Sequence, residues 1–211
     1  MKKKILLTSV IIAALLTTKT SIAQLKYGFA LSGGMSNINV VQKDKHTRFG
    51  NYFTASTQAA FDLFVSEKLK SKPISFEQGI SVETFAAKQN IPKKDYEDIL
   101  LYYPNLGPRV SELRSWQLAI PLKVKYETNR WLSFFAGVNN IFFINNNKII
   151  NHKYTLRGEV GADFLLANRF ILGLEGGYDI LPSGQFQDDK IFFHYYHVSA
   201  KVGILLSSLK K

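Results

Sequence analysis

From residue 27 to the end of the chain, apolar and polar side chains alternate in one segment after another. The clearest case is 155–166, where the even positions carry Leu156, Val160, Ala162, Phe164 and Leu166, and the odd positions carry Thr155, Arg157, Glu159 and Asp163. Because successive side chains of a strand point to opposite faces, such a segment has one apolar and one charged face. The alternation therefore predicts amphipathic β-strands.

The same pattern predicts eight strands, at 27–35, 53–65, 74–86, 115–126, 131–144, 155–166, 170–180 and 192–206. Most of them have at least the roughly 9–11 residues that a tilted strand needs to cross a bilayer. The polar phase carries small residues and charges of both signs, namely Asp62, Glu77, Glu83, Lys123, Lys125, Arg157, Glu159, Asp163, Glu175, Asp179 and Lys201. Since an eight-stranded barrel is just wide enough for side chains to fill, we expect these charges to pair inside it.

The connections between the expected strands alternate in length. The long ones are 36–52, 87–114, 145–154 and 181–191, and the short ones are 66–73, 127–130 and 167–169. Outer-membrane barrels have short periplasmic turns and longer external loops, and an even strand number puts both termini in the periplasm. The sequence thus predicts an all-β fold, an eight-stranded antiparallel up-and-down transmembrane β-barrel in the outer membrane. Pro121 conflicts with this in one place, since it cannot donate to the ladder in mid-strand.

Residues 1–23 are expected to be a secretory signal, and 24–211 a single barrel domain. Lys2, Lys3 and Lys4 precede an apolar stretch, and Ser21-Ile22-Ala23 is a small-x-small cleavage site. Removal of the signal lowers the formal net charge from +11 to +7, because Lys19 and the first three lysines leave with it. The remaining basic residues are spread along the chain, which argues against a nucleic-acid partner. Without cysteine, a lipoprotein anchor and disulfides are excluded.

The segment Trp116-Gln117-Leu118-Ala119-Ile120-Pro121-Leu122-Lys123-Val124-Lys125-Tyr126 resembles a strand of the PorT-like outer-membrane β-barrel family of Bacteroidota, which carries an IPL-x-x-K-Y pattern. An Ala-Gln signal end, Gly33-Gly34 and the glycine-rich 172–178 are similar to that family as well. The resemblance covers the mature chain and implies the barrel fold, the proline in the strand and a possible link to a secretion-related envelope complex. The chain departs from the usual barrel pattern because it does not end on an aromatic residue.

Several polar residues were weighed as sites. His194 and His197 are three apart and should face opposite sides of a strand, which disfavours a metal pair. Asp188 and Asp189 are interpreted as solvated loop residues. We therefore expect no metal, no cofactor and no catalytic residue. An alternative is a small lipid-modifying barrel enzyme that would use Ser199 and His197, with Glu175 in the same phase.

The connection 87–114 is the longest, and loops of that length are usually functional or disordered. Its apolar cluster 99–103 predicts an extra hairpin, a binding surface for a protein partner, or a lid over the barrel. The favoured function is a non-enzymatic outer-membrane protein with a structural, adhesive or complex-forming role, in contact with membrane lipids and lipopolysaccharide. A soluble lipocalin-like carrier, with its apolar face inward, is the third alternative. The sequence does not determine the oligomeric state.

Overall fold

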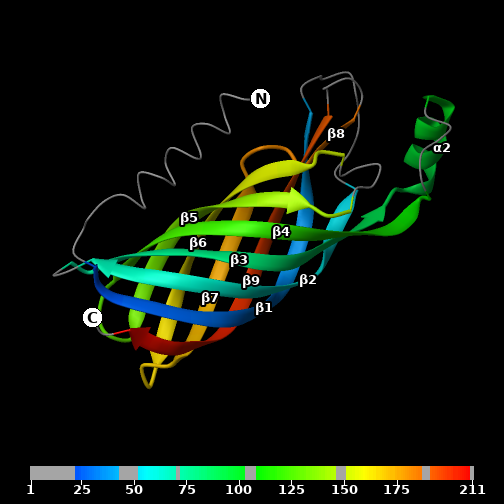
Figure 1. The fold of residues 1–211 in the computed structure, drawn as a ribbon. Helices are drawn as coiled ribbons and strands as arrows, with labels where there is room; N and C mark the ends of the chain where they lie inside the picture. Colours follow the sequence, from blue (N-terminus) through cyan, green and yellow to red (C-terminus); the bar gives the residue numbers. More distant parts are fainter. Residues whose placement is uncertain are drawn as a thin grey trace, which may run out of the picture.

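The computed structural model describes residues 22–42, 52–69, 72–102, 108–145, 151–186 and 191–209. Its strands are β1 (Ile22–Gln42), β2 (Phe53–Leu69), β3 (Ile74–Asn90), β4 (Val110–Glu127), β5 (Leu132–Phe143), β6 (Tyr154–Leu166), β7 (Phe170–Asp179), β8 (Gly184–Phe186) and β9 (Ile191–Leu209). All strand pairings are antiparallel. β1 to β7 and β9 follow one another around the sheet, and β1 pairs with β9 to close it (Figure 1). The predicted eight-stranded up-and-down barrel is confirmed.

The two faces of the wall are those that the alternation predicts. Side chains of the apolar phase lie on the outside, including Leu31, Leu63, Ile80, Val124, Val160, Leu174, Val198 and Val202. Charged side chains of the other phase are buried in the lumen. Trp131 stacks on Phe164 at the end of the barrel near the termini, and Trp116 lies toward the other end. A soluble carrier with an apolar interior and a polar exterior does not fit this arrangement.

The hairpin of β6 and β7 has a register that keeps the apolar positions of both strands on one face. Leu166 lies opposite Phe170, and Arg157 opposite Asp179. Ala167 and Asn168 in the turn have φ angles of 49° and 56°, and the Arg169 N–H donates to the Leu166 carbonyl at 3.0 Å. The register keeps both apolar sets on the outside, because a slip by one residue would exchange the faces.

Pro121 is accommodated without a bulge. The register of β3 with β4 is the same on both sides of it, from Gln78 opposite Leu122 to Ser81 opposite Ala119, and only Gly79 and Ile80 have no recorded partner between them. The Trp116 carbonyl accepts a hydrogen bond from the Ile144 N–H, on the β5 side. Backbone groups of successive strand residues face alternate neighbouring strands. Pro121, five residues further along, therefore has its backbone groups toward β3. The missing N–H therefore interrupts the ladder on that side alone.

Several strands are longer than the sequence predicts. β1, β2, β3 and β4 each continue at least four residues past an expected end, and β8 was not predicted. In the connection 87–114, β3 and β4 stay paired as far as Asn90 and Val110. The connection therefore extends the hairpin of β3 and β4, whereas residues 99–102 of the apolar cluster belong to a helix.

The short helix α2 (Lys93–Tyr102) lies beyond the ends of β3 and β4, at the tip of this extension (Figure 1). Pro92 precedes it, and the Tyr52 hydroxyl donates to Asp95 at 3.1 Å. We call residues 85–102 and 108–115 the β3–β4 arm. Among the described residues, no helix is long and apolar enough to span a membrane.

Candidate functional site

The lumen contains a layer of buried ion pairs near its middle. Three lysines meet four carboxylates there: Lys123, Lys125 and Lys201 face Glu77, Glu159, Asp163 and Glu175. Lys125 lies 2.5 Å from Glu77 and 2.6 Å from Asp163, and Lys201 lies 2.8 Å from the same aspartate. Lys123 lies 3.2 Å from Glu159. These side chains come from β3 to β9, so the ion pairs connect strands across the lumen.

An aromatic ring occupies the centre of this layer. Phe135 points inward from β5, and the three ammonium groups lie 4.8 Å, 5.8 Å and 4.9 Å from its ring centroid, for Lys123, Lys125 and Lys201 in that order. A cation is attracted to the face of an aromatic ring at such distances. Phe134 and Phe135 are adjacent in the sequence, and the structure places Phe135 in the lumen and Phe134 on the outside.

Toward the external end, Arg157 organises a second group. Its guanidinium donates to Asp179 at 2.9 Å, to Glu83 at 2.8 Å and to Gln117 at 3.1 Å, and it lies 4.3 Å from the centroid of the Phe85 ring. Arg157 and Asp179 are both 0% exposed. The expectation that charges of the polar phase pair inside the barrel is confirmed for Arg157 and Asp179.

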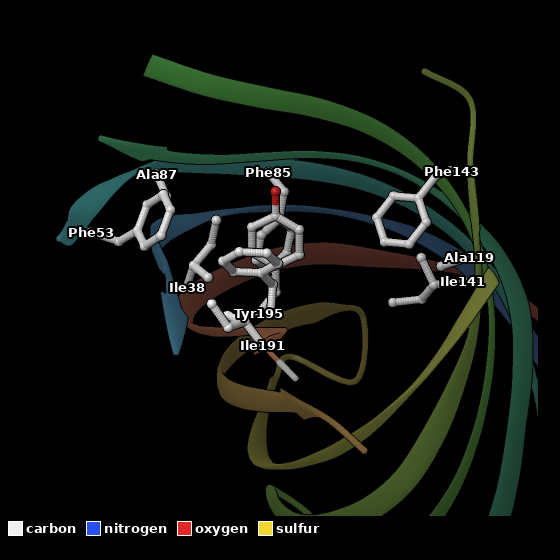
Figure 2. Packing of buried hydrophobic residues seen from close by; sticks show 10 residues of the cluster. Ile38, Phe53, Phe85, Ala87, Ala119, Ile141, Phe143, Ile191 and Tyr195 are labelled. Atoms are coloured by element: carbon white, nitrogen blue, oxygen red, sulfur yellow. The ribbon is translucent and has the colours of Figure 1, made fainter. Parts of the chain in front are cut away.

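Above Arg157 the lumen is apolar, which corrects the expectation of a wholly small or ionisable interior. The buried side chains of this external plug are Ile38, Phe53, Phe85, Ala87, Ala119, Ile141, Phe143, Ile191, Phe193 and Tyr195. Phe85 and Tyr195 lie at its centre with ring centroids 4.8 Å apart, flanked by Phe53 on one side and Phe143 on the other (Figure 2). Only Ile38, Ala87 and Ile191 lie beyond the predicted strand ends. The other residues lie within the predicted strands, whose inward phase was described from its small and charged side chains alone.

Little free volume remains inside. Within the described residues, the lumen holds a cavity of about 10 Å³ next to Asp62, Pro121 and His197. A recess of about 90 Å³, lined by Lys26, Lys125 and other residues, opens at the end near the termini. The smaller volume is about that of a single water position. The charge layer and the external plug therefore close the lumen.

Among the described residues, no hydrogen bond joins Ser199 to His197, the serine and histidine of the enzyme alternative. The Ser199 hydroxyl donates to Glu175 at 3.1 Å, whereas His197 packs edge-on against Phe85, 5.6 Å between ring centroids. Both Ser199 and His197 are buried in the lumen, away from the lipid-facing side. A serine is activated by a hydrogen bond to a base; here Ser199 has such a bond to Glu175 but none to the histidine.

The two histidines lie on opposite faces, as predicted. His194 is on the outer side, where it stacks on Tyr178 and its Nδ1 bonds to the Asp179 carbonyl at 2.8 Å. Asp188 and Asp189 lie outside the described residues. In the part of the chain that the structure describes, no group of three or more His, Cys, Asp or Glu side chains could hold a metal ion.

Asparagine–tyrosine pairs on the outer surface were not predicted. Asn37 donates to the Tyr196 hydroxyl and Asn39 to that of Tyr178, each at 3.0 Å. Between β5 and β6, the Tyr154 hydroxyl donates to Asn140 at 3.0 Å. These polar pairs lie where the outward apolar rows end. Asparagines and tyrosines at outward-phase positions near strand ends were the available signal in the sequence.

No family model and no curated protein matches the chain. Solved structures similar to it include the Neisserial surface protein A, with 9% identity and a TM-score of 0.46, over 83% of this chain and 96% of the other. The outer membrane protein OprG from Pseudomonas aeruginosa has 14% identity and a TM-score of 0.43, over 85% and 96%. A structure described as de novo design of transmembrane beta-barrels has 8% identity and a TM-score of 0.42, over 88% and 98%. The fold assignment rests on the strand order and register of the chain itself.

Proposed function

We propose that this chain is an integral outer-membrane protein without a conducting pore and without catalytic activity, whose barrel anchors the β3–β4 arm outside the cell. The closed lumen is the observation that carries this proposal. Ion pairs and the external plug fill the space that a channel would need. The outward rows of apolar residues support a location in lipid, because only closed barrels and helices satisfy their backbone groups there.

The proposed orientation puts both termini in the periplasm. The connections at the end of the barrel near the termini are short, as in the turn at 167–169 and that at 128–131. The arm and β8 lie at the opposite end (Figure 1). Short periplasmic turns and longer external segments are the rule for outer-membrane barrels. The signal at 1–23 is part of this proposal, and so is a relation to PorT-like barrels.

The role that fits best is structural, adhesive or complex-forming, with the arm as the contact surface for a protein partner. Leu101 on α2 is 80% exposed and Val110 at the start of β4 is 58% exposed. Both side chains would lie above the membrane surface, where lipid cannot cover them. Exposed apolar residues on a protruding segment are typical of interaction sites. Lipopolysaccharide in the outer leaflet would surround the base of the arm.

An arm-deletion variant tests the proposal. Asn90 and Val110 face each other in the ladder, so residues 91–109 can be replaced by a two-residue Asn-Gly turn. The variant should fold as the wild type does, with heat-modifiable gel migration and recovery in the outer-membrane fraction. A pull-down from detergent-solubilised membranes should lose partners that the wild type retains. Recovery of the wild type as a soluble protein, or stable single-channel conductance in planar bilayers, would contradict the proposal.

A further inference from the structure

The outer wall has a groove on the half of the barrel near the termini. It has a volume of about 510 Å³ and extends across β9, β1, β2, β3 and β4. Its walls are mainly apolar, with Tyr27, Leu63, Val65, Ile80, Leu122 and Leu206 among the lining residues. Since these side chains belong to the outward rows, the groove opens toward the lipid.

Two glycines shape the wall behind the groove. A Cβ atom on Gly79 would lie 2.2 Å from the Leu63 carbonyl oxygen, and one on Gly28 would lie 2.3 Å from the Ile204 carbonyl oxygen. Neither position can carry a side chain without moving a neighbouring strand. Glycine at such sites permits close backbone approach. The local shape of the wall thus depends on these residue types.

Polar groups also lie in the groove. Gln78 is exposed among the apolar residues of β3. Next to it the ladder is interrupted at Gly79, because Pro121 has no N–H to donate toward β3. Polar groups that face hydrocarbon without a partner cost free energy.

A carboxylate lies at the membrane-surface end of the groove. Glu67 continues the outward row of Leu63 and Val65 on β2, and it pairs with Leu25 and Phe76 on the adjacent strands. Within the described residues, no ion pair involves Glu67. Lys68, the next residue, has the opposite phase and forms an ion pair with Glu127. The groove is therefore a mainly apolar slot, and the Glu67 carboxylate lies just beyond it, at the next outward position of β2 after Val65.

We propose that this groove binds one phospholipid with a primary-ammonium headgroup, such as phosphatidylethanolamine. An acyl chain lies along Leu63, Ile80 and Leu122, and the ammonium group pairs with Glu67. An anionic headgroup is disfavoured by the same carboxylate. The inference rests on the proposed outer-membrane location, because the groove faces the leaflet that contains phospholipid only in that orientation.

Native mass spectrometry of the detergent-solubilised full chain tests this binding site. Phosphatidylethanolamine and phosphatidylglycerol with identical acyl chains are titrated into the protein. The wild type should prefer the ethanolamine lipid by about tenfold, the factor that one charge-assisted hydrogen bond supplies. Glu67→Gln should bind both lipids equally. Val65→Trp should fill the groove and lose the tight site, whereas Leu174→Trp, a matched change on the far lipid-facing side, should behave as the wild type.

Equal affinity of the wild type for the two lipids would overturn the proposal, as would retention of the site in Val65→Trp. A dimer whose formation Val65→Trp abolishes would assign the groove to a second copy of the chain and also overturn it. Heat-modifiable migration of every variant shows that each one is folded. If the wild type itself fails to show that migration and stays soluble without detergent, the outer-membrane proposal fails. If only the lipid-binding proposal is wrong, the wild type still shows heat-modifiable gel migration.

Discussion

Removal of Arg157 should destabilise the barrel more than any change of an exposed charge. Its guanidinium bonds to Asp179, Glu83 and Gln117, and Arg157 is 0% exposed. Arg157→Ala leaves two buried carboxylates without their cation. Breaking a buried ion pair by removing one partner costs about 3–5 kcal/mol. We expect a loss of that size in the free energy of unfolding. Arg169→Ala, in the exposed turn between β6 and β7, is the matched control and should change it by less than about 0.5 kcal/mol.

The measurement is equilibrium unfolding by urea of the barrel refolded into lipid vesicles, followed by the fluorescence of Trp116 and Trp131. A double-mutant cycle with Asp179→Ala isolates the pair, and residues in one network typically couple by about 0.5–3 kcal/mol. The coupling should be at the upper end of that range, because the 2.9 Å contact is shielded from water by the external plug. A loss below about 1 kcal/mol for Arg157→Ala, or a coupling of zero, would refute the role assigned to this network.

Three further results are expected. Leu174 is 61% exposed on the lipid-facing side, so Leu174→Arg should lower the free energy of unfolding by about 2–4 kcal/mol near the midplane. Glu175→Gln should lower it by less in the same urea assay, and the reverse order would exchange the inner and outer faces. Ala167→Gly should stabilise the barrel by up to about 1 kcal/mol, because φ is 49° there, whereas Ala167→Val should destabilise it. Hydrogen bonds from Ser56 and Arg114 hold the pKa of Glu112 below its usual range. Ser56→Ala should raise this pKa in an NMR titration, and an unchanged pKa would contradict the hydrogen bond.

The sequence alone determined the strand number, the two faces of the wall and the register of the last long hairpin. These follow from local rules: side chains alternate along a strand, and the parity of a short turn fixes which pairs can meet. The contact between Arg157 and Asp179 could be predicted for that reason. The same rules place His194 and His197 on opposite faces.

Only the tertiary structure decided how the lumen is filled and where the strands end. Glu83 reaches Arg157 from a strand 74 positions earlier in the chain, and no local pattern encodes such a distance. Ile38, Phe85 and Phe193 come from three different strands and meet in the external plug only in the closed barrel. The lipid-facing groove is also a product of closure, since Leu206 joins Tyr27 and Ile80 there only once β9 pairs with β1. Packing between strands far apart in the chain is what a reading of successive residues cannot supply.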